Sequence, residues 1–581
     1  MSATSSSAAG GIVLEEAKPL RESILWRLQS AFYNDVSIDA WSKAIVPNFV
    51  SSNSFLAKCY ARMILAYARD WFLGNGAADP SQPVYVLEVG AGHGKLTHLL
   101  LYHLNDMREA WPPGVEVPFQ IIMTDFTQNN VDFWLKHEPL KAHVESGLLD
   151  MAVFDAVYDC SLRLVHGKKT LNPTNLANPV IAITNYIFDT LPHDAFQVRG
   201  GALYQASVRT STASASEEAQ RKVQQVLGKA AAEGRPVPGT AVPVEAGMIK
   251  RLGCEWSYQE VDVETLPEPY AGDPALASVL QWYQGKVEEA SVLVPIGGLA
   301  LLRNLLTLSK GRCMLLLGDK AYSKLSELEG VRDPHIALHG SFSLMVNLHA
   351  VDLYAQAKGG FSLMTPYIDG FKCAAVVFGE SPEGLVETRL AWEDVMVDFG
   401  PENFSCVQRC IKDETASPSL ATALAVIRAA QWDSDVFYKF KATILANSSS
   451  SSVPDKLKSD LYEDVKRISA TYYPLQSSKD ISFELSRVLM GLGRYAEAVE
   501  GFQRSMAQCG EHHVTWYNIA LCQFHMGAFP AAKELFTKSL KQSGGRYENA
   551  KLWLDKTEEK LAALEGGKAE VAPEGGEAAA E

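Results

Sequence analysis

The sequence predicts an α/β protein with a doubly wound parallel sheet, preceded by a helical cap and followed by an all-helical repeat domain. Three observations lead to this fold class. An apolar strand ends in a glycine-rich turn, further apolar segments alternate with helical ones and end in acidic residues, and an internal repeat lies near the carboxyl end. Strands that alternate with helices favour a parallel sheet with helices on both faces.

Composition limits the classes of protein to which the chain can belong. Its 581 residues are enough for several domains, and its 47% hydrophobic and 21% charged residues are typical of a soluble globular protein. The net charge of -15 disfavours a nucleic-acid partner, because binding to phosphates needs clustered Lys and Arg. The nine cysteines include no C-x-x-C pair, so the sequence predicts reduced thiols, with no metal site and no disulfide framework.

The N-terminal segment does not read as a targeting signal. Residues Met1–Gly11 are rich in Ser and Ala without an apolar signal core, and the acids Glu15 and Glu16 that follow do not suit an organelle transit peptide. No apolar run reaches the length of a membrane span. We therefore expect a cytoplasmic protein with no membrane partner, while mitochondrial import stays open.

Residues 18–80 are predicted to form a helical cap ahead of the sheet. Ile24, Leu28 and Phe32 recur at four-residue spacing, as apolar residues on one face of a helix do. Such a cap can close over a ligand, although packing accounts for most of its apolar residues.

The stretch that follows the cap carries the most information about function. An apolar run at 84–89 ends in glycines at every second position, Gly90, Gly92 and Gly94, and a helix-like segment begins at Leu96. This pattern indicates a buried strand, a turn without side chains, and a helix whose first N–H groups face the turn. A nucleotide-bearing ligand can lie against such bare backbone.

The spacing of the glycines distinguishes between ligands. A phosphate-binding P-loop is excluded twice, because Val89 stands where its first Gly belongs and Leu96 follows Lys95 in place of Ser or Thr. A dinucleotide fingerprint, and with it an NAD(P)-linked oxidoreductase, is disfavoured because the third Gly comes one residue early, at Gly94. The remaining pattern, Glu88 followed by three alternating glycines, is the first motif of class I S-adenosylmethionine methyltransferases. An ordinary tight strand–helix turn is the alternative.

Four further apolar runs, at 119–125, 148–155, 178–184 and 312–319, continue the alternation with helical segments. Three of these runs end in an acid, and the run at 178–184 leads directly into Asn185. In open parallel sheets, ligands bind beyond the carboxyl ends of the strands. We therefore expect these polar side chains to face the ligand and a methyl acceptor to arrive at the end of the 178–184 strand, beside Asn185, Tyr186 and Asp189.

The three parts of S-adenosylmethionine match these positions. Asp125 can accept both ribose hydroxyls, Asp155 can accept from the adenine amine, and Phe126 or Phe154 can flank the ring. Each acid alone is explained equally well as a helix cap or a solvated loop carboxylate, but three acids behind this glycine turn together favour the cofactor. The predicted cofactor-binding residues are Glu88, Gly90, Gly92, Gly94, Asp125, Phe126 and Asp155.

Two regions outside the alternating pattern complete the α/β part. The regularity breaks near 205–295, where Ser207–Pro238 is rich in Ser, Ala, Gln and Gly and is predicted to be a surface insertion with one exposed helix. Phe361–Thr365 and Phe371–Phe378, separated by Pro366 and Gly370, are predicted to form an antiparallel hairpin.

The C-terminal part contains an internal repeat. Five positions recur 34 residues later (527 minus 493), which is the tetratricopeptide period: Gly493, Tyr495, Ala498, Phe502 and Ser505 return as Gly527, Phe529, Ala532, Phe536 and Ser539. Repeats of this kind form a concave groove, so we expect a protein or peptide partner there. The acidic tail at 565–581 is predicted to be disordered.

The strand-end motifs resemble those of a known family. The glycine turn, Met123–Phe126 and Asn185–Pro192 look like the MidA-like branch of class I methyltransferases, which includes the mitochondrial complex I assembly arginine methyltransferase. Gly318–Asp319 and Phe342–Ala350 resemble its later strand and loop. The resemblance covers roughly residues 45–380 and implies a Rossmann-like sheet, S-adenosylmethionine as cofactor and a methyl acceptor near Asn185. The repeats are not part of the core family.

One residue departs from that family. Its fourth motif reads Asn-Glu-Phe-Phe-Asp-x-Leu-Pro, and Tyr186 stands here at the position of the Glu. Carboxylates hold a guanidinium best, so this change puts arginine specificity in doubt without touching the cofactor motif. Asp189 matches the family's Asp and can orient an acceptor or cap the loop after the strand. The predicted catalytic residues are Asn185, Tyr186 and Asp189.

The sequence therefore predicts an S-adenosylmethionine-dependent methyltransferase that acts on a protein side chain and recruits its partner through the repeats. A non-catalytic assembly scaffold and a small-molecule methyltransferase remain as alternatives. The predicted organisation is a disordered N-terminus (1–17), a helical cap (18–80), a methyltransferase domain with an insertion near 205–295 (81–412), a helical connector (413–480), repeats with a capping helix (481–564) and a disordered acidic tail (565–581).

Overall fold

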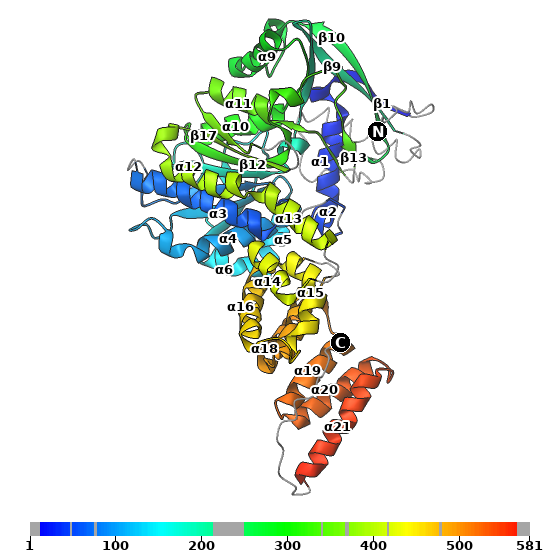
Figure 1. Cartoon of the computed structure of the whole chain (residues 1–581). Helices are drawn as coiled ribbons and strands as arrows, with labels where there is room; N and C mark the ends of the chain where they lie inside the picture. The colour runs from blue at the N-terminus through cyan, green and yellow to red at the C-terminus, as the bar shows by residue number, and fades with distance from the viewer. Residues whose placement is uncertain are drawn as a thin grey trace. The chain divides into compact units, whose positions relative to one another are not determined.

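The computed structural model describes residues 12–43, 45–46, 49–74, 78–212, 249–338, 341–366, 371–414, 418–475 and 479–565. The chain forms two compact units, Met1–Ser405 and Cys406–Glu581 (Figure 1). The division falls within helix α13 (Pro401–Glu414), which also contains the predicted boundary at 412.

The first unit is built on a sheet of eight strands, which confirms a mixed α/β fold with a multi-stranded sheet. Seven strands follow the order β16-β17-β12-β7-β2-β3-β4, and β15 lies beside β12. The strands from β12 to β4 are parallel, whereas β17 is antiparallel to both its neighbours, so the predicted hairpin is present. Their bounds are β2 (Val84–Val89), β3 (Phe119–Asp125), β4 (Leu149–Val153), β7 (Val180–Asn185), β12 (Cys313–Tyr322), β15 (Val346–Asn347), β16 (Phe361–Met364) and β17 (Phe371–Phe378).

Helices cover both faces of this sheet. Figure 1 shows α10 and α11 on one face and α3 and α12 on the other. The strands are buried on both sides, and all six residues of β2 are buried, which explains why they read as continuous apolar runs. The helices are α3 (Ser54–Arg69), α4 (Lys95–Asp106), α5 (Gln128–Lys136), α6 (Glu138–Glu145), α9 (Pro274–Lys286), α10 (Ile296–Leu308), α11 (Leu348–Ala357) and α12 (Val386–Trp392).

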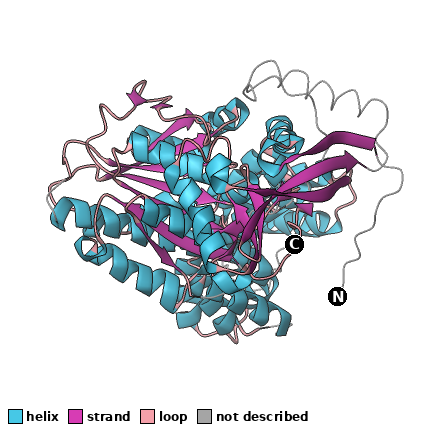
Figure 2. Ribbon diagram, turned by 90° about the horizontal axis from the view of Figure 1, so that it is seen from above, coloured by secondary structure: helices cyan, strands magenta, loops and turns pink. Residues whose placement is uncertain are grey.

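A second, antiparallel sheet was not predicted from the sequence. Its order is β1-β9-β8-β11, with β10 also paired to β9, and its long strands are visible in Figure 2. The strands are β1 (Ile12–Pro19), β8 (Asp194–Arg199), β9 (Ala202–Thr212), β10 (Leu252–Val261) and β11 (Glu289–Val294).

This sheet corrects two sequence predictions. The N-terminus was expected to be disordered up to residue 17, but from Ile12 it pairs with β9, in a register that places Ile12 opposite Thr212. Residues 207–212 were assigned to a surface insertion, but they are the end of β9, in which Thr210 and Thr212 are buried. The low hydrophobicity of these hydroxyl side chains hid the alternation that marks a strand. The exposed helix expected farther along the insertion lies outside the described residues.

A buried ion pair joins the N-terminal segment to the second sheet. Arg21, in the short turn η1 (Leu20–Glu22), donates from Nη1 to Asp194 Oδ2 at 2.8 Å. The fully buried Asp194 also accepts from Gln205 Nε2 at 3.1 Å and from Tyr270 at 3.3 Å. Helix α1 (Ile24–Val36) follows, capped by the Ser23 hydroxyl, and packs its apolar face on this sheet. The pair therefore fixes where α1 begins.

The second unit is helical throughout its described residues. Helices α17 and α18 pack as one antiparallel pair and α19 and α20 as the next, with α21 against α20. The positions that recur in the sequence are equivalent here: Phe502 and Phe536 are fully buried, and Gly493 and Gly527 both have left-handed φ angles, of 73° and 79°. The helices are α14 (Leu420–Ala429), α15 (Ser434–Ser448), α16 (Asp455–Thr471), α17 (Ile481–Gly491), α18 (Tyr495–Cys509), α19 (His513–His525), α20 (Phe529–Gln542) and α21 (Glu548–Glu565).

Across the described ranges of both units, each helix is too short or too polar to cross a membrane.

We expect the Asp194→Ala substitution to destabilise the first unit by about 3–5 kcal/mol. Arg21 would lose its buried counter-ion and keep only the partly exposed Glu22, and Gln205 and Tyr270 would lose their acceptor. Urea denaturation followed by circular dichroism measures this loss. Glu255→Ala is the matched control, since its pair with Arg209 is exposed and a much smaller loss is expected. Equal losses in the two variants would contradict the anchoring role of the buried pair.

Candidate active site

A cavity of about 590 Å³ lies at the carboxyl ends of the parallel strands. The turns that follow β2, β3, β4 and β7 form one wall of the cavity. Helix α1 and the cap residues Trp41, Val46 and 49–52 form the other wall. The volume suits a small organic ligand or cofactor. The cap therefore borders the cavity as well as packing on the second sheet.

The glycine turn after β2 is held in a conformation that excludes side chains. Gly90, Gly92 and Gly94 have left-handed φ angles of 65°, 54° and 84°. A Cβ at Gly90 would overlap Ile187, and one at Gly92 would lie 2.9 Å from the ring of Trp41. Gly90 and Gly92 line the cavity, whereas Gly94 does not and instead precedes the first residue of α4. Both the backbone angles and the close neighbours therefore require glycine at the first two positions.

Glu88 is a buried acid on the cavity wall. Only 6% of its surface is exposed, and its carboxylate accepts the hydroxyl hydrogen of Thr97. Burial raises the pKa of Glu88 to about 7, against the opposing effect of the Thr97 hydrogen bond. Near neutral pH the group can therefore change its charge when a cationic ligand enters.

Asp125 ends β3 and faces the same cavity. Its Oδ1 accepts from the backbone and hydroxyl of Thr127, both at 3.0 Å, and its Oδ2 accepts from Asn130 Nδ2 at 2.8 Å. Burial raises the pKa of Asp125, while these hydrogen bonds oppose the shift. The donors fix the carboxylate and leave it acceptor capacity for a ligand hydroxyl. The half-buried Phe126 lines the cavity beside it.

The turn after β4 supplies a further part of the wall. Phe154 is buried, with 2% of its surface exposed, and both Phe154 and Asp155 line the cavity. Asp155 Oδ1 accepts the backbone N–H of Val157 at 2.9 Å, so its side chain also stabilises its own turn. The sequence left open whether Asp155 caps a turn or faces the ligand. In the structure it does the first and also lines the cavity.

Asn185 and Tyr186 stand at the end of β7, on the opposite side of the glycine turn. Asn185 Oδ1 accepts the hydroxyl of Tyr60 at 2.7 Å, which leaves its amide Nδ2 buried and without a partner among the described residues. Tyr186 has a left-handed φ of 51°, and its ring lies 5.4 Å from that of Phe371. The amide of Asn185 is therefore a hydrogen-bond donor available to a ligand.

Asp189 lies in the short turn η4 (Phe188–Thr190) and also lines the cavity. Its Oδ1 is buried and finds no partner in the described part of the chain. Burial raises the pKa of Asp189 to about 7, and the positive charge of Lys320 opposes the shift. An unpartnered buried oxygen of this kind can receive a proton or a hydrogen bond from a ligand.

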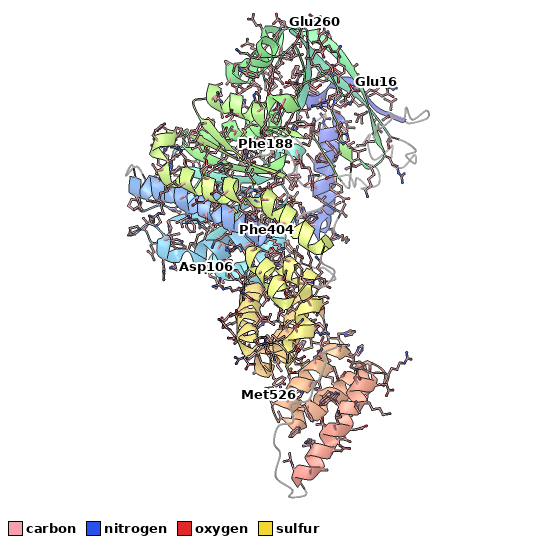
Figure 3. All side chains as sticks on the ribbon, viewed as in Figure 1. Glu16, Asp106, Phe188, Glu260, Phe404 and Met526 are labelled. Carbon is pink, nitrogen blue, oxygen red and sulfur yellow. The ribbon has the colours of Figure 1, made fainter. Side chains whose placement is uncertain are left out.

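The position of Asp189 is set by its neighbours. The adjacent Phe188, labelled in Figure 3, is fully buried, and a Cβ at Gly298 of α10 would overlap its ring. The backbone N–H of Asp189 donates to Asp319 Oδ2 at 3.2 Å. The turn is therefore fixed both by packing against α10 and by a hydrogen bond to β12.

Several residues that shape the site were not predicted as site residues. Tyr60 orients Asn185, Trp41 covers Gly92, and Trp134 donates from Nε1 to the carbonyl of Gly92 at 2.9 Å. Asp319 had the same signal as the other acids, an apolar strand that ends in a carboxylate, and could have been included on that ground. The aromatic residues carried no signal, because their role depends on contacts between distant segments.

Comparisons with known proteins give limited information. No protein-family profile and no curated protein matches the chain. Two solved structures from Burkholderia thailandensis are similar in part: a COG1565 superfamily protein in its native form, at 12% identity, and a COG1565 superfamily member and candidate methyl transferase bound to S-adenosyl-homocysteine, at 13% identity. Each comparison covers 62% of this chain and 75% of the other, with a TM-score of 0.33. That TM-score is too low to assign the fold. The function is therefore inferred from the geometry of the site.

The pKa of Glu88 predicts how stability depends on pH. Because the native pKa of about 7 lies above the ordinary value of 4.5, the native state holds this proton more tightly than the unfolded state does. The contribution is therefore greatest below the unfolded pKa and is lost as pH rises through about 7. We expect the unfolding free energy of the wild type, relative to Glu88→Gln, to fall by about 3 kcal/mol across this range. Urea denaturation at a series of pH values measures it, and a difference that stays constant with pH would contradict the assignment.

Proposed function

We propose that the chain is an S-adenosylmethionine-dependent methyltransferase of the MidA-like type. The observation that carries the proposal is the arrangement around one cavity. The bare glycine turn and Asp125 come from adjacent strands on one side. On the other side lie Asn185 and Asp189, each with one buried polar atom that has no partner among the described residues. A cofactor side and an acceptor side are what a two-substrate transfer requires.

The residues on the cofactor side fit S-adenosylmethionine. Gly90 and Gly92 leave bare backbone for the amino-acid end, and the titratable carboxyl of Glu88 suits its ammonium group. Asp125 suits the ribose hydroxyls, and the rings of Phe126 and Phe154 suit adenine. The sheet that presents them has the parallel order expected of a Rossmann-like methyltransferase.

The cofactor supplies an activated methyl group, so the protein's own part is to bind, orient and exclude water. Asn185 can hold an acceptor by its amide N–H, which has no partner in the described ranges, and Asp189 can hold the proton of a nucleophile at its Oδ1. The cap residues Tyr33 and Trp41 line the opposite wall and limit access of water. In this proposal Tyr186 shapes the acceptor side and does not act as an acid or a base, because burial raises its pKa far above neutral.

We propose a protein side chain as the methyl acceptor. The neutral Tyr186 in place of a carboxylate weakens the case for arginine, because a guanidinium is held best by anionic partners. The second unit supports a protein substrate. Its helical pairs repeat with the 34-residue tetratricopeptide spacing (527 minus 493) and bury equivalent residues, so it is proposed to recruit the substrate or an assembly partner.

Isothermal titration of the purified chain with S-adenosylmethionine and S-adenosylhomocysteine tests the cofactor. We expect micromolar binding that is lost in Asp125→Ala, because the ribose hydroxyls lose their acceptor. Gly92→Arg should also abolish binding, since a side chain there meets Trp41. Asp132→Ala is the matched control, because this exposed acid of α5 lies near Asp125 in sequence and accepts a hydrogen bond from Gln128 Nε2 at the protein surface.

The outcomes separate the candidate functions. No binding by folded wild-type protein would overturn the methyltransferase proposal and leave a non-catalytic scaffold. If the cofactor binds, proteins captured by the full chain are incubated with methyl-labelled cofactor and analysed by mass spectrometry. Label on a captured protein supports the proposed acceptor class, whereas label only on small molecules would overturn it.

A further inference from the structure

Two carboxyl groups lie together at the ends of neighbouring strands, on the acceptor side of the cavity. Asp189 follows β7, and Asp319 is in β12, which pairs with β7 in parallel. Asp319 is fully buried, and its two oxygens accept the backbone N–H groups of Asp189 at 3.2 Å and of Lys320 at 2.9 Å. Asp189 keeps one oxygen unpartnered among the described residues, and it lines the cavity. Asp319 does not line the cavity.

The surroundings of Asp189 offer little to balance a negative charge. The groups that face it are the carboxyl of Asp319, the ammonium of Lys320 and the phenols of Tyr33 and Tyr186. Both phenols stay neutral, because burial raises their pKa values. Lys320 is exposed to solvent, which screens the positive charge of its ammonium group. Burial favours the protonated form of Asp189, and burial together with the neighbouring Asp189 raises the pKa of Asp319. The protonated form of Asp189 is favoured until another positive charge comes near.

The methyl donor and the product of the proposed reaction differ in the charge on their sulfur atom. The donor carries a positive sulfonium, and the product carries a neutral thioether, while both have the same ammonium group at the amino-acid end. The sulfur lies between the amino-acid and ribose ends, which the proposed function assigns to the glycine turn and Asp125. The methyl group it carries must face the remaining wall, where Asp189 is located.

We propose that Asp189, beside Asp319, carries a proton in the free site and releases it to solvent when the sulfonium cofactor binds, so that the site selects the methyl donor over the product by charge. The inference rests on the proposed function and adds a specificity-determining residue to it. An ionised Asp189 attracts the sulfonium but gains nothing from the thioether. Product release is thereby favoured without any change in the contacts to ribose and adenine.

The sign of the pH dependence follows from the burial of Asp189. Its pKa of about 7 would fall when the sulfonium is present, so donor affinity rises with pH until the free carboxyl is ionised. The affinity for the product does not depend on the ionisation of Asp189, because the thioether is neutral. Glu88 also titrates near neutral pH, but it faces the ammonium that both ligands share, so its contribution cancels when the two are compared.

Calorimetric titration in buffers of different ionisation enthalpy, such as phosphate and Tris, counts the protons released on binding. For the full chain at about pH 7, we expect S-adenosylmethionine to release up to about half a proton more than S-adenosylhomocysteine. Between about pH 6 and pH 8, the ratio of the product's Kd to the donor's Kd should rise by up to about tenfold.

Two variants assign this difference to Asp189. Asp189→Asn keeps the shape of the side chain but cannot titrate, so the excess proton and the pH dependence of the ratio should both disappear. Lys320→Met removes the cation that lowers the pKa of Asp189. The excess proton release should therefore persist, and the midpoint of its pH dependence should move to higher pH. Asp132→Asn serves as the unaffected control. If Asp189→Asn does not fold, Lys320→Met still tests the proposal, because an unchanged midpoint in that variant would contradict it.

The results distinguish this inference from the proposed function. If neither ligand binds the wild type, the methyltransferase proposal fails and the inference with it. If both bind and release equal numbers of protons, the cofactor assignment stands and the charge selection is overturned. It is also overturned if the excess persists in Asp189→Asn, because another group would then carry the proton.

Discussion

The site depends on one constraint of parallel sheets: the carboxyl ends of neighbouring strands meet at the same edge. In this chain β12, β7, β2 and β3 bring their last residues together there, and the sheet is buried on both faces up to that edge. Acids at these ends are therefore largely removed from water. The raised pKa values of Glu88 and Asp189 follow from that placement and are not separate features of the two residues.

The features that could be predicted from the sequence are those set by local patterns. The strand at 119–125 has the bounds expected from its apolar run, and the hairpin at 361–378 follows from the punctuation by Pro366 and Gly370. The glycine turn was identified because its alternating spacing reflects backbone angles that other residues rarely adopt. Asp125, Asp155 and Asn185 were predicted because each follows a buried strand. All the predicted site residues except Gly94 line one cavity.

The features that were missed depend on contacts between segments far apart in the chain. The second sheet pairs the N-terminal strand with residues near 210, and its anchor joins Arg21 to Asp194 across 173 positions. Tyr60 orients Asn185 across 125 positions. Neither partner of such a pair has a distinctive neighbourhood in the sequence, so the geometry of the site becomes visible only when the cap, the second sheet and the main sheet are placed together.

The packing of Trp41 over the glycine turn has an optical consequence. The indole stacks near Tyr33, with ring centroids 6.0 Å apart, and meets the edge of His93 at 5.9 Å, while its other atoms border the cavity. A ligand that occupies the turn changes the polarity around this ring, and with it the wavelength and intensity of indole emission. Trp41 is thus a built-in fluorophore beside the glycine turn. Because Trp26 lines the same cavity and the chain has 11 tryptophans, the difference between the wild type and Trp41→Phe isolates its signal.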